Sequence, residues 1–559
     1  MLQRLFFCVL VICGGFGAGC LSPPALDTGV LRVAINREPT TFNSLLVADT
    51  TTQIVTDQLH APLIRLNQQT QEIEPALAEW WEFSEDGKTL VFRLKRGVRF
   101  SDGEPLTAAD VVFTFRVLND PEVASPLVDT AQIDGEPIVP ELVDDLTVAF
   151  RLPRRTATVD RIFDSIRILP EHRLAESLQN GTLAQDSGLS ASVETIVGLG
   201  PFRLRDYEVG QRIVLERNPY YWRSKKNDVY PRLEGLVFDV VPDRSTRELR
   251  LLAGEVDLLE RISPESFRAL AIESQPSLKL EDLGPGMVSE RLWFNLNPES
   301  PIESYKKRWF SDVRFRRAFS LAIDRRGLAR VVYFGLATAA SGSVSPANRF
   351  WRNTAIATTE QDVDEARRLL EVAGFRLHDD GRLFDPDGNR VQLTIVTTAG
   401  SNERQRAGAF IQEDLSELGI DVTLAPLEGG DLLARVTGSY DYEAFLLGIT
   451  QTDPDPSAEM ALWPSRAPLH LWHPSQAEPA TAWEARIDEL MEAQMVALDV
   501  EHRKACYYEV QAIVAEQLPM LDLVVPHALL GIHRRVQNVR ATPFGHPLWN
   551  SDELTLESW

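Results

Sequence analysis

The spacing of apolar positions along the chain predicts strands and helices that follow one another over most of its length. Patterns typical of strands cover residues 31–35, 90–94, 213–216, 236–241, 291–295 and 391–396. Apolar residues at helical spacing cover 108–118, 362–373, 403–418 and 502–516. Because no repeat or low-complexity tract interrupts this order, we expect a mixed α/β architecture of several layers, with right-handed βαβ units in the second half.

One stretch shows how clear the local signals are. In residues 97–115, GVRFSDGEPLTAADVVFTF, the dipeptide Asp102-Gly103 is typical of a turn. Thr107 can cap a helix, and Asp110 three residues later completes an acidic form of the capping box. The stretch therefore predicts a strand, a turn and a capped helix, but it indicates no function.

The first residues differ in character from the rest. Arg4 precedes an apolar run over residues 5–16, which is shorter than the roughly 20 residues that a membrane-spanning helix needs. Small residues and Cys20 follow, so residues 1–19 are predicted to be a secretory signal peptide. The ending Ala18-Gly19-Cys20 resembles the lipobox of bacterial lipoproteins, which predicts that Cys20 is lipidated. Simple secretion with an incidental cysteine is the alternative. Residues 20–28, with two prolines, would be a tether.

Composition narrows the classes of function. A chain of 559 residues exceeds one ordinary core, so two or three domains are expected. The net charge of −24 argues against a nucleic-acid partner. Cys8 and Cys13 would leave with the signal peptide and Cys20 would carry lipid. Cys506 then remains alone, which excludes a disulfide framework or a thiolate metal cluster.

Motifs for catalysis or metal binding are weak. The sequence has no G-x-S-x-G, no H-E-x-x-H and no P-loop. Gly198 and Gly200 form a bare G-x-G that lacks the third glycine of a dinucleotide site. His470 and His473 have a spacing that a metal could use, but flanking prolines argue against a helix, and packing histidines are the simpler interpretation. We therefore expect no enzyme activity, no cofactor and no bound metal.

A series of longer motifs carries a family resemblance. In chain order they are residues 75–115, the strand GLGPFRLRDYEVGQRIVLERNPYYW at 198–222, LAGEVDLL at 252–259 and FSDVRFRRAFSLAIDRRGL at 310–328, followed by ARRLLEVAGF, IQEDLSELGIDV and YYEVQAIVAEQLPMLDL. Together they resemble the bacterial extracellular solute-binding proteins of family 5, the peptide and nickel receptors of ABC importers. The likeness covers nearly all of the chain after the predicted signal peptide.

The resemblance implies a fold and its division. We expect an α/β, periplasmic binding protein-like type II fold (cluster C), with two lobes, a hinge and an inserted domain. On that pattern residues 29–55, 196–283 and 524–559 form lobe I, residues 56–195 form the inserted domain, and residues 284–523 form lobe II.

The implied function is capture of a solute and its delivery to a membrane. We expect a monomeric, lipid-anchored receptor on the periplasmic or extracellular face of the membrane. Its hinge would close on oligopeptides or related extended solutes, and its partner would be a permease–ATPase complex. A receptor for a non-peptide solute such as a nickel chelate, or a signalling or adhesion lipoprotein that kept the fold, are the alternatives.

The resemblance also implies ligand-binding positions. In peptide-binding relatives an aspartate before an acidic-Pro turn pairs with the ligand's α-amine. Here the loop reads LLGITQTDPDPS, residues 446–457, and Thr450 occupies the expected aspartate position. Asp453 or Asp455 could substitute for it if the register shifts. The alternative is that both aspartates only shape a proline turn.

A second position lies at the start of the helix predicted at 403–418, where dipeptide receptors carry an arginine for the ligand carboxylate. A helical wheel places Arg404 near the apolar face, so Arg404 is our candidate, with a structural salt bridge as the alternative. Asn402 beside it is also a candidate. In the Trp- and Pro-rich segment 467–491, Trp472 is a candidate for stacking on the ligand, as is Trp483. The alternative is that the tryptophans pin the loop to lobe II.

Overall fold

A computed structural model describes residues 29–557, apart from 134, 158, 274 and 452. The predicted signal peptide and the whole predicted tether, residues 20–28 with Cys20, lie outside the described residues. In the part of the chain that is described, the principal feature is a 12-stranded sheet. Its main path runs β10 (Phe202–Glu208), β11 (Arg212–Arg217), β12 (Gly235–Val240), β1 (Val30–Ile35), β13 (Leu258–Glu260), β22 (Met520–His533), β15 (Val288–Phe294), β21 (Ala444–Thr450), β19 (Gln392–Thr398) and β20 (Asp421–Leu427).

Strand β22 belongs to both ends of this sheet. Its second part pairs with β13 and with β14 (Leu278–Pro285), whereas its first part pairs with β15 and with β16 (Ala337–Ala339). We call β1 together with β10–β14 the first sheet half, and β15, β16, β19, β20 and β21 the second sheet half. The chain crosses between the halves along β22 and through residues 285–288, where the Gly286 N–H donates to the Pro526 carbonyl at 2.9 Å.

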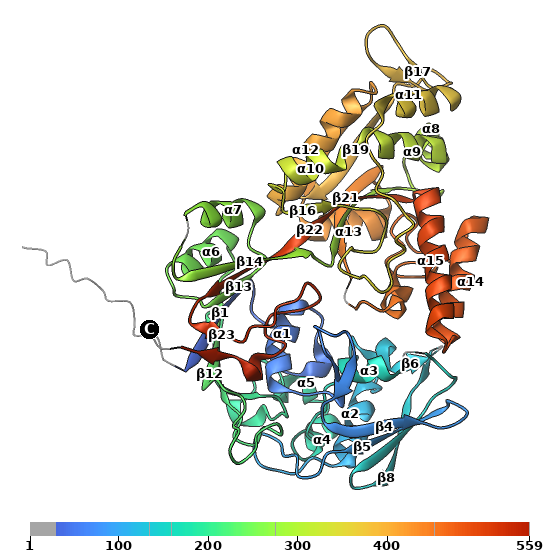
Figure 1. Ribbon diagram of the computed structural model, residues 1–559. Helices are drawn as coiled ribbons and strands as arrows, with labels where there is room; N and C mark the ends of the chain where they lie inside the picture. Colours follow the sequence, from blue (N-terminus) through green and yellow to red (C-terminus); the bar gives the residue numbers. More distant parts are fainter. Residues whose placement is uncertain (1–28, 134, 158, 274, 452, 558–559) are drawn as a thin grey trace, which may run out of the picture.

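The first sheet half has its own core. Helix α1 (Thr50–Leu59) packs on it, and helices α6 (Arg244–Leu252) and α7 (Pro264–Glu273) lie near β13 and β14 (Figure 1). Apolar side chains from β1, α1 and β12, among them Leu31, Val55 and Phe238, form one buried cluster. The short strands β23 (Val536–Gln537) and β24 (Thr555–Leu556) follow β22, so the end of the chain returns to this half.

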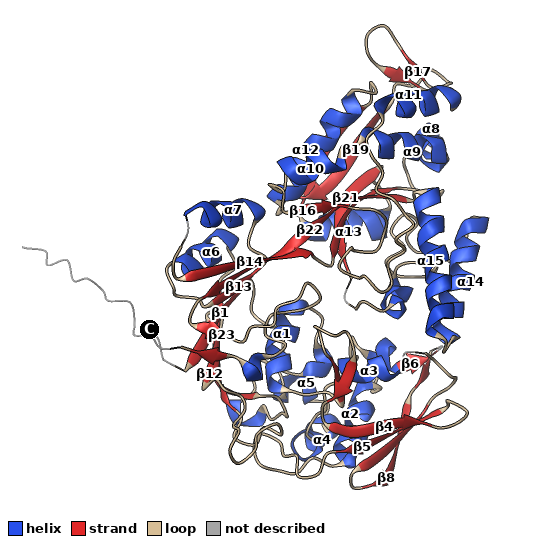
Figure 2. Cartoon of the chain, viewed as in Figure 1, coloured by secondary structure: helices blue, strands red, loops and turns tan. Residues whose placement is uncertain are grey.

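The second sheet half contains the predicted βαβ unit. Strands β19 and β20 are parallel neighbours, and α12 (Asn402–Ser416) connects them. Its other helices are α8 (Ser304–Ser311), α9 (Val313–Ala322), α10 (Arg325–Val331), α11 (Val363–Val372), α13 (Gly429–Ala434), α14 (Ala482–Val496) and α15 (Val500–Gln517). A small hairpin, β17 (Arg376–Leu377) and β18 (Leu383–Phe384), projects at its tip (Figure 2).

A separate four-stranded sheet lies below the second half. Its order is β4 (Ala78–Phe83), β5 (Thr89–Leu94), β9 (Thr147–Arg151) and β8 (Val139–Asp144). Helices α2 (Ala108–Leu118), α3 (Val159–Ser165), α4 (Glu171–Gln179) and α5 (Leu183–Asp186) and the short pairs β2 (Ile64–Leu66) with β3 (Ile73–Pro75) and β6 (Gln132–Ile133) with β7 (Glu136–Pro137) accompany it. Its buried core includes Phe92, Phe115, Phe150 and Phe163. We call this unit the four-stranded body.

The local predictions agree closely with these elements. The capped helix is α2: the Thr107 N–H donates to the Asp110 carboxylate at 2.9 Å, and Gly103 adopts a positive φ of 96° in the turn before it. The predicted helices at 362–373, 403–418 and 502–516 correspond to α11, α12 and α15, with ends that differ by one or two residues. The mixed α/β fold class is therefore confirmed.

Candidate functional site

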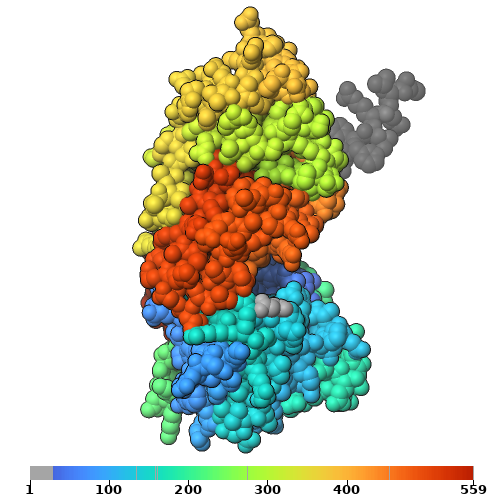
Figure 3. Space-filling view, turned by 90° about the vertical axis from the view of Figure 1, so that its right-hand side faces the viewer, coloured from blue at the N-terminus to red at the C-terminus, as the bar shows by residue number. Residues whose placement is uncertain are grey.

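A large cavity separates the four-stranded body and the first sheet half from the second sheet half. Its volume is about 1380 Å³. The space-filling view shows the hollow between the blue and cyan body and the orange and red part of the second half (Figure 3). Helices α1 and α3, the crossing segment at 285–288, the end of β21, the first turn of α12 and the loop 541–549 all contribute lining residues.

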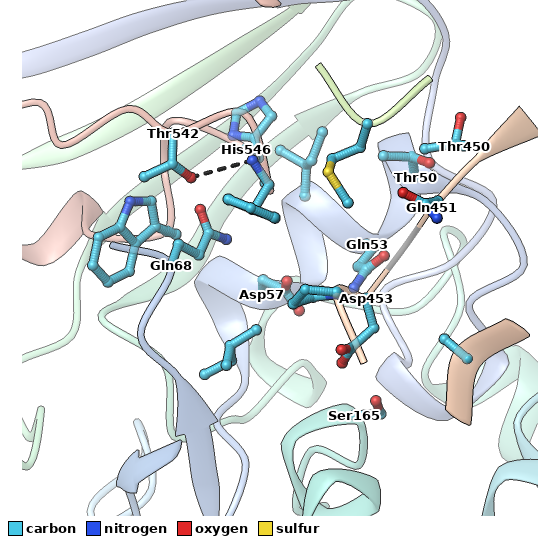
Figure 4. Close-up of a pocket in the computed structure, with 18 of the residues that line it drawn as sticks. Thr50, Gln53, Asp57, Gln68, Ser165, Thr450, Gln451, Asp453, Thr542 and His546 are labelled. Carbon is cyan, nitrogen blue, oxygen red and sulfur yellow. Dashed lines mark hydrogen bonds between the residues drawn. The ribbon is translucent and has the colours of Figure 1, made fainter. Parts of the chain in front are cut away.

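Neutral polar groups and an apolar wall share this cavity. Figure 4 shows Thr50 and Gln53 from α1, Gln451 after β21, Ser165 at the end of α3, and Thr542 from the carboxyl-terminal loop around one space. Apolar lining is supplied by Ile54, Ile162, Met287, Val288, Phe544 and Trp549. Such a mixture suits an extended solute, because apolar contacts supply affinity and a few polar groups fix orientation.

Arg404 lines the cavity, but its guanidinium is already paired. Nε and Nη2 donate to the two carboxylate oxygens of Glu290 at 2.8 and 3.1 Å. Only 19% of the Arg404 side chain and 9% of the Glu290 side chain are exposed. Burial opposes the charge, yet Glu290 outweighs it and raises the pKa of Arg404. The structural salt bridge, which the sequence left open as the alternative, is therefore present.

Asp453 is also paired within the protein. Arg161 of α3 donates to its carboxylate at 2.7 Å, so the four-stranded body reaches the Asp-Pro loop of the second half. Burial raises the pKa of Asp453, although Arg161 opposes that shift. Asp455, two residues on, accepts a bidentate pair from Arg503 of α15 at 2.6 and 2.9 Å, and the pKa of Asp455 is lowered by these bonds despite its burial.

Thr450 and Gln451 lie where β21 leads into this loop, and Gln451 is bound by a buried carboxylate. Thr450 ends β21 and lines the cavity, with an exposed side chain. Gln451 donates to the buried carboxylate of Glu459, which also accepts from Trp463 and Tyr507. Gln451, Asp453 and Asp455 are therefore each held by a partner within the protein.

Four of the predicted residues lie away from the cavity lining: Asn402, Asp455, Trp472 and Trp483. Asn402 is exposed at the first turn of α12 and is absent from the lining residues. Trp472 is fully buried among Trp293, Trp463 and Trp483, and its indole N–H donates to Glu484 at 3.0 Å. The prediction that Trp472 stacks on a ligand is corrected: its ring has no free face, and it pins the loop to the second half.

His470 belongs to the same buried cluster. Its ring lies 3.9 Å from the Trp472 ring, and its Nε2 is 3.6 Å from Glu484. Burial opposes ionisation of Glu484, but the adjacent His470 ring and the hydrogen bond from Trp472 outweigh it and lower the pKa of Glu484 to about 2. Among the described residues, no group of three or more His, Cys, Asp or Glu side chains could hold a metal ion.

Among the described residues, several ion pairs cross the cavity between its two walls. Besides Arg161–Asp453, Arg154 contacts Glu492 of α14 at 2.9 Å, Arg244 of α6 contacts Glu403 at 2.8 Å, and Arg406 contacts Glu265 of α7 at 3.1 Å. A backbone hydrogen bond also joins the two walls, from the Ala157 N–H to the Met495 carbonyl at 3.0 Å. These contacts can only form when the walls are close.

The cavity wall formed by α1 and α3 carries titratable residues that the sequence did not single out: Asp57, His60 and Asp164. Asp57 of α1 lies 2.8 Å from Arg167, and burial raises the pKa of Asp57 against the effect of that arginine. Asp164 lines the same space, and burial raises its pKa too. His60 at the end of α1 is buried against the Phe42 carbonyl, and burial lowers its pKa to about 4. No motif marks these residues, because their partners are distant in sequence.

The two sheet halves, the shared strand and the cavity between them define a periplasmic binding protein fold of type II. The model of the bacterial extracellular solute-binding proteins, family 5 (middle), matches residues 72–468. The chain belongs to this family. It is thus a solute-binding component of the ABC transporter type, a transport receptor and not an enzyme.

Individual relatives align with this chain over most of their own length. The dipeptide-binding protein of Escherichia coli K12 is 26% identical over 525 residues, covering 91% of each chain. The oligopeptide-binding protein AppA of Bacillus subtilis 168 is 24% identical over 543 residues, covering 95% of this chain and 91% of AppA.

Solved structures share the fold. The structure of Bacillus subtilis AppA in complex with a nonapeptide has a TM-score of 0.73 at 23% identity and covers 95% of this chain and 99% of AppA. NikA from Brucella suis, in complex with Fe(III)-EDTA, has a TM-score of 0.78 at 22% identity and covers 94% of this chain and 100% of NikA. Within the described residues, each helix is too short or too polar to cross a membrane.

We expect Arg404→Ala to lower the free energy of unfolding by about 3 kcal/mol, because it leaves the largely buried Glu290 carboxylate unpaired. Arg406→Ala on the same helix should cost less than about 1 kcal/mol, since its partner Glu265 is exposed. Urea denaturation of both variants measures the difference. Equal losses would contradict a structural role for the Arg404–Glu290 pair.

We expect the double variant Arg154→Ala/Arg161→Ala to open the cavity, because it removes the cross-cavity ion pairs that these two arginines form. The radius of gyration from small-angle X-ray scattering should increase, and high salt should increase it in the unaltered protein for the same reason. Arg486→Ala is the matched control, because its partners Glu489 and Glu509 lie on α14 and α15, in the same sheet half. An unchanged radius in the double variant would refute the prediction.

Proposed function

We propose that this protein captures oligopeptides, or solutes of similar extended shape, by closure of two lobes and delivers them to a membrane permease–ATPase complex. The single observation that supports this most is the cavity of about 1380 Å³ between two sheet halves that share β22. Its volume exceeds the roughly 300–1,000 Å³ of ordinary small-molecule pockets, so it has room for a solute of several residues. Relatives named as dipeptide- and oligopeptide-binding proteins favour the same class.

In this proposal the first sheet half is lobe I, with residues 29–55, 196–283 and 524–559. The second half is lobe II, with residues 284–523, and the four-stranded body is the inserted domain, with residues 56–195. The solute would contact both lobes, so the closed state would bind it better and would gain population. Thr450 and the paired residues Arg404 and Asp453 would border it, as their place in the lining suggests.

The receptor would be held at the outer face of a membrane by lipid on Cys20, with residues 21–28 as a spacer, and would act as a monomer. The signal-like residues 1–19 and the lipobox-like ending at Cys20 support the anchor. The acidic surface, with a net charge of −24, does not oppose this attachment because a lipid chain inserts by its apolar area.

The experiment for the solute is native mass spectrometry of the protein purified from its own cells. Co-purified peptides in the bound fraction, together with loss of peptide uptake after gene deletion, are the expected result. Bound metal chelates would favour the nickel-type alternative instead. Normal uptake of peptides and chelates in the deletion strain, with a stable sensor-protein complex, would overturn the transport role.

The anchor has its own test. Cys20→Ser should abolish incorporation of labelled fatty acid and move the protein from the membrane to the soluble fraction of the cell envelope. A matched substitution at Cys506, which is buried in α15 far along the chain, should leave lipidation unchanged. Fatty acid on the Cys20→Ser protein would rule out this attachment site.

A further inference from the structure

The floor of the cavity holds one more negative charge than its arginines balance. Asp57 is paired with Arg167 at 2.8 Å, and Asp453 with Arg161 at 2.7 Å. Asp455 is satisfied by Arg503 behind the loop. These three carboxylates and three guanidiniums pair with one another, which leaves Asp164 without an ion-pair partner of its own among the described residues.

Asp164 lies in the last turn of α3 and lines the cavity. Its Oδ1 accepts the Leu66 N–H at 3.0 Å, which fixes the carboxyl group on the floor. Among the described residues, no lysine, arginine or histidine forms an ion pair with it. Arg167 donates from Nη1 to the backbone carbonyl of Asp164 at 2.6 Å, and its carboxylate partner is Asp57.

The neighbours of Asp164 make this position costly for an unpaired carboxylate. Burial raises its pKa most, Arg167 opposes that effect, and the nearby Asp453 and Asp57 raise it further. A positive group in the cavity would relieve both the burial and the repulsion. Neutral acceptors are also close at hand, because Ser165 and Gln53 face the same space (Figure 4).

The loop after β21, on the opposite wall of the cavity, offers a positive solute no unpaired carboxylate among its described residues. Thr450, at the end of β21, has no charge to offer, although the family resemblance implies an aspartate there. Asp453 is occupied by Arg161, and Glu290 is occupied by Arg404. The carboxylates that the second sheet half presents to the cavity at these positions are therefore already neutralised by the protein.

We propose that Asp164, from the four-stranded body, binds a cationic group of the solute, either an α-amine or a lysine or arginine side chain. This inference rests on the proposed function and specifies its ligand class. It assigns the cation-binding group to α3, on the wall opposite Thr450. Asp129 also lines the cavity but is exposed, so water already solvates its charge and it offers far less selectivity.

The test is competitive capture from a defined mixture. The probe is a random tetrapeptide pool mixed with an equal amount of its N-acetylated form, and peptides retained by the purified protein are identified by mass spectrometry. The variants are Asp164→Asn and the control Asp129→Asn. Asparagine can still accept the Leu66 N–H, and an unchanged thermal midpoint verifies that the variant folds.

We expect the unaltered protein and Asp129→Asn to enrich cation-bearing peptides at least tenfold over acetylated peptides that lack Lys and Arg. Asp164→Asn should lose that preference, because a charge-assisted bond is gone. Persistent preference in Asp164→Asn, or enrichment of cation-free peptides by the unaltered protein, would overturn the inference while leaving peptide binding intact. No enrichment of any peptide would overturn both this inference and the proposed ligand class.

Discussion

The backbone pairing of β22 is the constraint on which the rest of the structure depends. One strand supplies hydrogen-bond partners to β13 and β14 at one end and to β15 and β16 at the other. The two sheet halves cannot separate without breaking that strand. Between them the sheet narrows to the segment around Pro526, where proline has no N–H to donate and the β14 ladder shifts register. Any bending between the two sheet halves has to pass through this crossing, because β22 and residues 285–288 connect them there.

Charge pairing across that cavity follows from the same geometry. A guanidinium and a carboxylate that face each other over a closing gap lose water together, so neither can remain single at low cost. Most charged groups in the cavity lining form an ion pair within the protein, as Arg404 does with Glu290 and Arg161 with Asp453. The pairs that cross the gap are partly exposed, and each contributes modestly. Several together are comparable with the few kcal/mol that separate two conformations of a binding protein.

The sequence predicted what depends on neighbours along the chain. The spacing of apolar residues predicted helices α11, α12 and α15 to within two residues at each end, and the cap at Thr107 and the turn at Gly103 predicted the start of α2. These signals are local in the sequence. The helical wheel correctly turned Arg404 inward. It could not identify Glu290, which is 114 residues away, and Arg161 pairs with Asp453 across 292 residues. The prediction that Trp472 stacks on a ligand was wrong for a related reason. An aromatic-rich loop has the same composition whether it covers a ligand or packs on a core.

The global charge and the local charge of this protein act over different distances. Its net charge of −24 attracts cations to the whole surface, but at physiological ionic strength that attraction fades within about 8 Å. It can raise the encounter rate of a positive solute without choosing where the solute rests. Selective binding of a positive solute requires a carboxylate that has no ion-pair partner within the protein and is partly buried from water. Where an arginine already holds the carboxylate, a solute cation must displace it and gains little. Selectivity in such a cleft is therefore set by the charge that internal pairing leaves over, and the abundance of charged residues in its lining is a poor guide to it.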